Sequence, residues 1–409
     1  MAGSGRACEK APGTRPSDAG EAMFGMERVF GSRFRAAFVG LTLLGVVVVG
    51  GPTSAGATPL SWSITPSPLD ALTPGTATTP PGIGRGPDSD FAAVSCTDSK
   101  FCVAVGSYGA QPEGTLNEVW DGTRWSVMPR SSVLNSTLAG ISCVSRIFCF
   151  AVGGSTTTTN ESTLTEMWDG SNWSVAISPS PGGPLDQLNS VSCLNRSWCV
   201  AVGYSTDPVD HNQRTLVESW NGAAWSVVPT PTVGIASTSL SGVSCVTRSF
   251  CIAVGTVSDP AGSGITVIER WNGTAWSLMN APALDLSGGV SCVTTRFCMA
   301  TGFGVIERWD GSSWTIVPNP LTTHPTPFYT GVSCLRPSFC VASELRGSTP
   351  GSVTGSVIAW DGTAWSIPSG AIVVGNWLNG VSCASSRFCF TVGGPRRYGH
   401  SSVAILGRP

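Results

Sequence analysis

The sequence predicts an all-β protein, a seven-bladed β-propeller with four antiparallel strands in each blade. Fourteen of the fifteen cysteines form seven pairs with the same C-x5-C spacing, and successive pairs begin 42 to 52 residues apart. That interval is about the length of one blade. Six of the seven copies also carry Asp-Gly or Asn-Gly between two tryptophans. This dipeptide is a strong hairpin signal, because its residues tolerate positive φ.

Each copy divides into four short strands. The fullest copy contains VSCVTRSFCIAVG, then TVIERW, then NGTAWS. The first strand ends in VSC, the second is FCxAVG, the third is TLxExW, and the fourth surrounds WS. Twelve of the fifteen tryptophans flank the hairpin at one structural position, which predicts packing between blades. They are Trp120/Trp125, Trp168/Trp173, Trp220/Trp225, Trp271/Trp276, Trp309/Trp314 and Trp360/Trp365.

The last copy lacks its fourth strand. The missing phrase occurs at the other end of the chain, where residues 60–68 (LSWSITPSP) resemble the fourth-strand phrase WSVAISPSP of the second copy. We expect residues 60–68 to complete the last blade and close the ring, so that no sheet edge stays open between the termini. Residues 69–90, rich in Pro, Gly and Thr, are then a loop.

The cysteine pairs predict one hairpin disulfide in each blade. A C-x5-C hairpin places two cysteines opposite each other on adjacent strands, within disulfide range. Zinc sites use closer C-x2-4-C spacing and a second ligand pair, and the chain has only three histidines. We therefore predict no metal and no cofactor. The predicted disulfides are Cys96–Cys102, Cys143–Cys149, Cys193–Cys199, Cys245–Cys251, Cys292–Cys298, Cys334–Cys340 and Cys383–Cys389.

Residues 1–57 are predicted to be a signal peptide. Arginines precede an apolar run at residues 36–51, and the run ends at a small-residue cleavage pattern closing on Ala57. Translation can instead start at Met23 or Met26, which would give a signal of ordinary length. The apolar run is shorter than a spanning helix needs, although an uncleaved anchor is the alternative. We expect residues 58–409 to be a single domain, secreted or held at the cell surface, monomeric, with no stable membrane span.

The repeated phrase VSC…FCxAVG…W-D/N-G-xx-WS resembles a repeat of secreted, uncharacterised proteins of actinobacteria and related bacteria. The D-G-x-x-W hairpin is also loosely similar to the Asp-box of sialidase-type propellers and to kelch-type propellers. It lacks the preceding Ser, and Asn replaces Asp at Asn221 and Asn272. The resemblance covers residues 60–409 and implies a propeller. It carries over no catalytic residue.

Charge patterns add two repeated features. Every C-x5-C turn holds a basic residue, and Asp121, Asp169, Asp310 and Asp361 lie in hairpins on the same face, so we expect ion pairs between these groups. A ring of cations that binds a polyanion is the alternative. With a formal net charge of −2, nucleic acid is not an expected partner. The basic residues are Lys100, Arg146, Arg196, Arg248, Arg296, Arg336 and Arg387. The repeated glutamates, which we interpret as structural, are Glu118, Glu166, Glu218, Glu269 and Glu307.

The two faces of the propeller differ in sequence variation. Near-identical turns make up the face with the C-x5-C and D/N-G turns, the regular face. The loops between second and third strands and between blades differ from copy to copy, and they make up the variable face, where we expect function. Two sets of residues are candidates for ligand binding there. Phe328 and Trp377 occupy equivalent places in adjacent copies, and Arg396, Arg397, Tyr398 and His400 form a cluster that no other copy repeats. A loop with Asp207, Asp210 and His211 is a weaker candidate, for a cation.

The sequence therefore favours a non-catalytic binding protein. Its expected partner on the variable face is a glycan, a cell-wall component or an extracellular protein. A carbohydrate-active hydrolase or lyase with its site in the central pocket is the second hypothesis, and a purely structural surface module is the third. Only four tyrosines are present, and no set of acids outside the repeat suggests catalysis. The residue inventory argues against an enzyme without excluding one.

Overall fold

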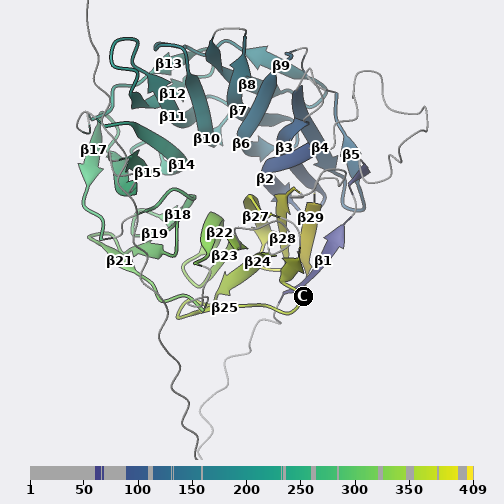
Figure 1. Cartoon of the computed structure of the whole chain (residues 1–409). Helices are drawn as coiled ribbons and strands as arrows, with labels where there is room; N and C mark the ends of the chain where they lie inside the picture. Colours follow the sequence, from purple (N-terminus) through teal and green to yellow (C-terminus); the bar gives the residue numbers. More distant parts are fainter. Residues whose placement is uncertain are drawn as a thin grey trace, which may run out of the picture. The chain divides into compact units, whose positions relative to one another are not determined.

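Figure 1 shows the fold of the protein in a computed structural model. The structure describes residues 60–65, 67–68, 89–108, 114–129, 131, 133–157, 160–231, 233, 236–258, 264–282, 285–320, 326–346, 354–374, 377–394 and 403–408. These residues belong to one compact unit that spans Ala57–Pro409. No apolar helix of membrane-spanning length occurs among them. The predicted signal peptide and the cluster of Arg396, Arg397, Tyr398 and His400 lie outside the described residues.

Four consecutive strands build each of six sheets, and a seventh combines strands from both ends of the chain. Blade 1 contains β2 (Ser89–Asp98), β3 (Phe101–Tyr108), β4 (Gly114–Trp120) and β5 (Trp125–Val127). Blade 2 contains β6 (Ser136–Ser145), β7 (Phe148–Thr156), β8 (Glu161–Trp168) and β9 (Trp173–Ala176). Blade 3 contains β10 (Asp186–Asn195), β11 (Trp198–Thr206), β12 (Gln213–Trp220) and β13 (Trp225–Val227). Blade 4 contains β14 (Thr238–Thr247), β15 (Phe250–Ser258), β16 (Gly264–Trp271) and β17 (Trp276–Met279).

The remaining sheets follow the same plan with local departures. Blade 5 contains β18 (Val290–Thr294), β19 (Phe297–Thr301), β20 (Ile306–Trp309) and β21 (Trp314–Ile316). Blade 6 contains β22 (Phe328–Arg336), β23 (Phe339–Arg346), β24 (Thr354–Trp360), β25 (Trp365–Ser366) and β26 (Ile372–Val374). Both β25 and β26 pair with β24, so this blade has five strands and not the predicted four. Pro368 lies between the two short strands, and proline lacks the N–H that a continuous outer strand would use.

The seventh sheet has the order β1-β29-β28-β27, with β1 (Ser61–Thr65), β27 (Gly380–Ser385), β28 (Phe388–Gly393) and β29 (Val403–Arg408). Figure 1 shows the N-terminal β1 beside β29. The predicted closing strand is confirmed, although it covers 61–65 and not all of 60–68. The predicted loop at 69–90 extends too far, because Ser89 and Asp90 already belong to β2; the rest of that loop lies outside the described residues.

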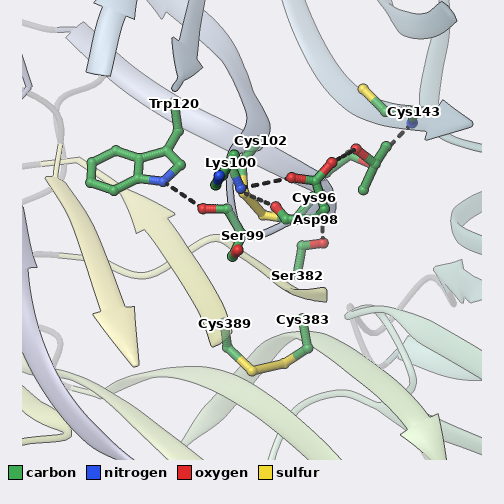
Figure 2. The surroundings of a disulfide bond; sticks show 12 residues. Cys96, Asp98, Ser99, Lys100, Cys102, Trp120, Cys143, Ser382, Cys383 and Cys389 are labelled. Carbon is green, nitrogen blue, oxygen red and sulfur yellow. Dashed lines mark hydrogen bonds between the residues drawn. A yellow bond between two sulfur atoms is a disulfide. The ribbon is translucent and has the colours of Figure 1, made fainter. Parts of the chain in front are cut away.

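The innermost strands contact one another around a closed ring, in the order β2, β6, β10, β14, β18, β22, β27 and back to β2. One hydrogen bond repeats at every junction and explains the VSC phrase. The backbone N–H of each first cysteine donates to the hydroxyl of the serine that precedes the first cysteine of the previous blade, at 2.9 to 3.1 Å. Figure 2 shows this bond between Cys96 and Ser382, where blade 1 meets blade 7.

All seven predicted disulfides are present, one in each blade, and each joins residues that face each other on the first and second strands. The first tryptophan of each pair covers the adjacent turn. In Figure 2 the indole N–H of Trp120 donates to the carbonyl of Ser99, and the other five blades with a tryptophan pair have the equivalent bond. Trp120 and Trp125 also pack edge-on against Phe390 of blade 7, with ring centres 5.1 and 5.0 Å away. The predicted tryptophan packing between blades is confirmed there.

The D/N-G hairpins require glycine. All six glycines have φ between 100° and 105°, where a side chain is strained. The preceding Asp or Asn accepts hydrogen bonds from backbone N–H groups two and three residues later, as Asp310 does from Ser312 and Ser313 at 2.8 Å. These hairpins therefore hold themselves together locally, which leaves the regular face nearly identical from blade to blade.

Candidate functional site

The central channel is lined by short, uncharged side chains. A cavity of about 210 Å³ lies between the first strands, and its wall is made of Gly, Ala, Val, Ile, Ser, Thr and Asn residues. Among the described residues, no ionisable side chain lines this cavity. General acid–base chemistry requires such a group within hydrogen-bond reach of a substrate. The channel therefore does not support the hydrolase or lyase alternative.

Side chains in the channel wall join the blades. The first strands bulge at equivalent places, as between Leu188 and Ser190. Asn189, at that bulge, donates to the carbonyl of Leu240 in the next blade at 2.8 Å. Thr330 donates to Leu378 at 2.6 Å, and Asn379 donates to Phe91 at 2.9 Å, across the corresponding junctions. The polar groups of the channel thus have structural partners.

The blades differ most at the start of their first strands. In each blade a fully or almost fully buried apolar or aromatic residue lies in the first strand near its start or just before it, at Phe91, Leu138, Leu188, Leu240, Leu286, Tyr329 and Leu378. We call the residue immediately before it the rim residue, since it lies where the first strand enters from the variable face. The rim residues of blades 1 to 7 are Asp90, Thr137, Gln187, Ser239, Asp285, Phe328 and Trp377.

Phe328 and Trp377 are thus placed at equivalent rim positions in neighbouring blades, and both are half-buried. Phe328 pairs with Leu345 on β23. The backbone N–H of Trp377 donates to the backbone carbonyl of Gly394 at 2.8 Å. A Cβ on Gly394 would lie 2.3 Å from an Asp90 carboxylate oxygen, so the rim of blade 7 adjoins the rim of blade 1. The structure brings the two predicted aromatic residues to one side of the rim.

Phe303 is a third aromatic residue on this side, which the sequence analysis did not identify. It forms an antiparallel bridge with Phe328, and its side chain is 55% exposed. The connection between β19 and β20 spans only residues 302–305, so it folds against the start of blade 6. Gly304 donates to Pro327 at 2.7 Å, and Tyr329 donates to Gly302 at 3.1 Å. In this copy the FC and ERW motifs lie closer together in sequence than the equivalent motifs of the other copies, and this shortened connection is the sequence signal that could have identified Phe303.

Asp90 ends this series of rim residues at blade 1. Its carboxylate accepts two hydrogen bonds of 3.1 Å from the side-chain amide of Asn379. Burial raises the pKa of Asp90 to about 6, although the Asn379 hydrogen bonds act in the opposite direction. We call Phe303, Phe328, Trp377 and Asp90 the aromatic arc. Flat apolar rings beside a hydrogen-bonding carboxylate are a combination suited to sugar rings and their hydroxyls.

Blade 6 departs from the repeat inside the sheet as well. Glu344 stands where six other blades have glycine, and Tyr329 stands where they have Leu or Phe. Glu344 is fully buried, pairs with Arg346 at 3.1 Å, and accepts a hydrogen bond from Ser356. The Tyr329 hydroxyl donates to Asn319 at 2.7 Å. Burial, and then the charge of Glu344, raise the pKa of Tyr329. Residues 342–344 read ASE where most other copies read AVG. This departure was a sequence signal for the site, but the site was not predicted.

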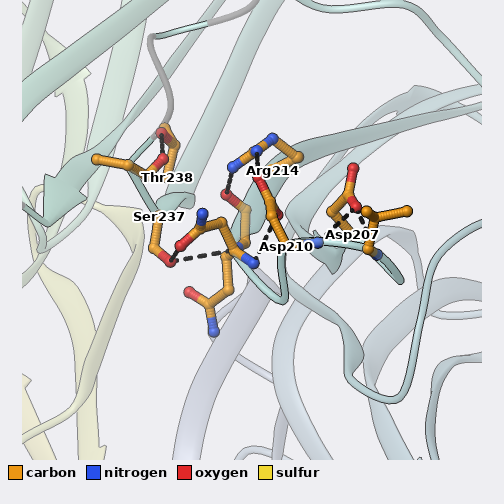
Figure 3. Close-up of polar contacts among 9 residues, drawn as sticks. Asp207, Asp210, Arg214, Ser237 and Thr238 are labelled. Carbon is orange, nitrogen blue, oxygen red and sulfur yellow. Dashed lines mark hydrogen bonds and ion pairs between the residues drawn. The ribbon is translucent and has the colours of Figure 1, made fainter.

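The loop with Asp207, Asp210 and His211 forms an ordinary turn. Asp207 accepts from the backbone N–H of Val209 at 2.8 Å, and Asp210 forms an ion pair with Arg214 (Figure 3). No group of three potential metal ligands occurs among the described residues. The geometry here gives no support to a cation site.

The basic residues of the C-x5-C turns have partners other than those predicted. Asp121, Asp169, Asp310 and Asp361 accept hydrogen bonds within their own hairpins, and no ion pair among the described residues joins them to these cations, so the expected pairing is wrong. Three of these cations instead contact the C-x5-C turn of the preceding blade. Arg146 binds Asp98 at 2.7 Å, Arg196 donates to the Ile147 carbonyl at 2.9 Å, and Arg248 donates to Ser197 at 3.2 Å.

The five repeated glutamates are fully buried on third strands. Glu118, Glu166 and Glu218 accept hydrogen bonds from the preceding blade, from its tail or, for Glu166, also from Asn117 on its third strand. Ser67 donates to Glu118 at 2.7 Å, and Ser178 donates to Glu218 at 2.7 Å. Burial raises the pKa of Glu218 and of Glu269 to about 7. Their place between blades supports the structural interpretation.

Comparisons with known proteins show the fold only. No family model matches the chain, and no curated protein matches it. A solved structure of YCF48 bound to a D1 peptide is 13% identical, covers 86% of this chain and 95% of its own, and has a TM-score of 0.54. A polysaccharide lyase, an ulvan lyase bound to -[GlcA(1-4)Rha3S]-, is 10% identical over 76% of this chain and 90% of its own, with a TM-score of 0.52.

Proposed function

We propose that this protein is an exported, non-catalytic propeller that binds a glycan through the aromatic arc on its variable face. One observation carries the proposal. Phe303, Phe328 and Trp377 lie in three successive blades, and the last of these adjoins Asp90 of blade 1, while the channel cavity has no ionisable side chain in its wall. Aromatic rings at such a site bury apolar sugar faces at low entropic cost.

Two further findings support a binding role outside the cytosol. Seven disulfides indicate folding in an oxidising compartment. Propellers of similar fold bind a peptide in one case and a polysaccharide in another. Removal of residues 1–57 as a signal peptide is part of this proposal.

The test is a binding screen of residues 58–409 against glycans and isolated cell-wall material, with the double variant F328A/W377A. Each stacked ring contributes about 1 kcal/mol, so losing both weakens binding by roughly 30-fold. The matched control is T137A/S239A, which changes two rim residues on the other side of the ring. Thermal unfolding checks that both variants fold.

Binding that survives F328A/W377A unchanged would refute the aromatic arc. Binding of a protein but of no glycan would move the function to the second partner class, an extracellular protein. No saturable binding of either kind would favour the purely structural module.

A further inference from the structure

We propose a second binding surface on the regular face, over blades 3 to 5, that holds an anionic polysaccharide. It is independent of the aromatic arc and of the partner bound there. Five arginines define this surface, the basic sector: Arg196, Arg248, Arg270, Arg296 and Arg308.

Charge balance singles out these three blades. Among the described residues of their C-x5-C and D/N-G turns, the one carboxylate is that of Asp310. Blades 3 and 4 have Asn221 and Asn272 where the other hairpins have Asp, and these amides keep the hairpin bonds at 2.9 to 3.0 Å without the charge. The turns of blades 1 and 2 instead contain three cations, Lys100, Arg124 and Arg146, and three carboxylates, Asp98, Asp121 and Asp169. The turns of blades 1 and 2 therefore have no net charge, whereas those of blades 3 to 5 have a net positive charge.

Three of the five arginines are exposed, and the side chains of Arg196, Arg248 and Arg270 have uncharged partners. Arg196, Arg248 and Arg296 are exposed, while Arg270 and Arg308 are half-buried. The Arg196 guanidinium lies 5.4 Å from the centre of the Phe148 ring, and that of Arg270 lies 5.2 Å from the Phe250 ring. Hydrogen bonds to a carbonyl or hydroxyl and contacts with a ring orient a guanidinium without cancelling its charge. Because Arg196 and Arg248 each reach into the preceding blade, their charges lie along neighbouring turns.

A linear polymer with repeated anionic groups fits such a row of fixed cations, since each additional ion pair adds to the attraction. The oxidising compartment indicated by the disulfides favours a polysaccharide over nucleic acid. Trp198 adds a feature suited to sugars. It begins β11 beside the Arg196 turn, it is half-buried, and the other six blades have phenylalanine at this position. An indole offers a larger face than a phenyl ring for stacking against a sugar.

The experiment measures binding of residues 58–409 to dextran sulfate, with neutral dextran as the uncharged probe. We expect binding to dextran sulfate alone at low salt, and a loss of most of it in roughly 0.5 M NaCl, where the screening length falls to about 4 Å. The variant R196Q/R248Q/R296Q lowers affinity by roughly 10-fold or more. The matched control K100Q/R124Q/R146Q also removes three cations, but from turns with three carboxylates, and it lowers affinity by less than about 2-fold.

Two further probes identify the anion. Polygalacturonate presents carboxylates and a poly(glycerol phosphate) presents phosphodiesters, so their relative affinities show which group the sector prefers. The variant W198F weakens polysaccharide binding by roughly 3-fold with an unchanged salt dependence. Equal losses in the two triple variants, absence of binding to all three polymers, or tighter binding of single-stranded DNA would each overturn the proposal.

Discussion

The regular and variable faces are built from the same seven sheets but use sequence differently. On the regular face the repeated hairpin acids and the first tryptophan of each pair have local structural partners, as the Asp310 carboxylate has in its own hairpin and the Trp120 indole has in the Ser99 carbonyl. On the variable face the rim position takes Asp, Thr, Gln, Ser, Phe and Trp in turn, on one unchanged backbone plan. The comparison shows that repetition carries stability and that departures from it mark candidate sites.

The largest expected effect is on the repeated disulfides. Chain-entropy arguments give about 2 kcal/mol for each short C-x5-C loop, so reduction of all seven removes as much as the typical total stability of a domain. We expect the protein to unfold at 25 °C when fully reduced, as measured by near-UV circular dichroism in increasing dithiothreitol. A single-bridge variant, C193S/C199S, should stay folded with a lower melting temperature. A fully reduced protein that keeps its native spectrum would contradict this account.

The buried glutamates predict lower stability at higher pH. Burial raises the folded-state pKa of Glu218 and Glu269 to about 7, against 4.5 for a free glutamate. Because the folded-state pKa is raised, each glutamate contributes roughly 3 kcal/mol to the free energy of unfolding below about pH 4.5. This contribution is lost as the pH rises through 7. Urea unfolding at pH 4.5, 6 and 8 measures the slope. E218Q keeps the shape and removes the charge, so it should flatten the profile, and an unchanged slope would argue against this origin.

A variant that gives blade 6 the residues common to the other blades tests whether its exceptional residues serve the variable face. Y329L/E344G places the common residues of the other blades at the two exceptional positions. The change removes the Tyr329 hydroxyl, which donates to Asn319, and the Glu344 carboxylate, which pairs with the mostly buried Arg346. Because Arg346 is left without its carboxylate, we expect the free energy of unfolding to fall by about 3 kcal/mol. Lost glycan binding with a normal melting curve would show that the exception serves the variable face. A strongly destabilised variant would show that the pair is structural.

A smaller effect is expected from the hydrogen bonds between blades. S244A removes the hydroxyl that accepts from the N–H of Cys292 at 2.9 Å. Loss of one neutral hydrogen bond costs about 1 kcal/mol, or somewhat more because the N–H stays partly buried. S226A, on an exposed outer strand, is the matched control and should lie within about 0.5 kcal/mol of the wild type. Chemical denaturation of both variants measures the difference.

The fold was largely predictable because the residues that determine it recur at fixed spacing from copy to copy. Cys193 and Cys199 imply a hairpin, Asn221-Gly222 implies a tight turn, and Trp62 in a displaced WS phrase implies closure by β1. The side-chain partners were not predictable in the same way. Asp121 was assigned to a neighbouring cation, whereas two backbone N–H groups in its own hairpin are closer to it. Tertiary distances of that kind do not appear in a repeat pattern.

The candidate site was predictable only where a residue broke the pattern visibly. Phe328 and Trp377 stood out against Thr137, Gln187 and Ser239. Phe303 did not, because its exposure depends on a shortened connection folding over the next blade. Glu344 was not predicted, because the repeat shows only that this position departs from glycine and not that the side chain is buried beside Arg346. Arg396, Arg397, Tyr398 and His400 stay a sequence-based prediction.

Hydrogen–deuterium exchange tests the central claim most directly. Residues 58–409 would be compared with and without soluble, neutral cell-wall glycan fragments. The account predicts slower exchange at the starts of β22 and β27 and at residues 302–305, and no change in the D/N-G hairpins. Protection spread evenly over all blades, or confined to the regular turns of blades 1 and 2, would contradict it.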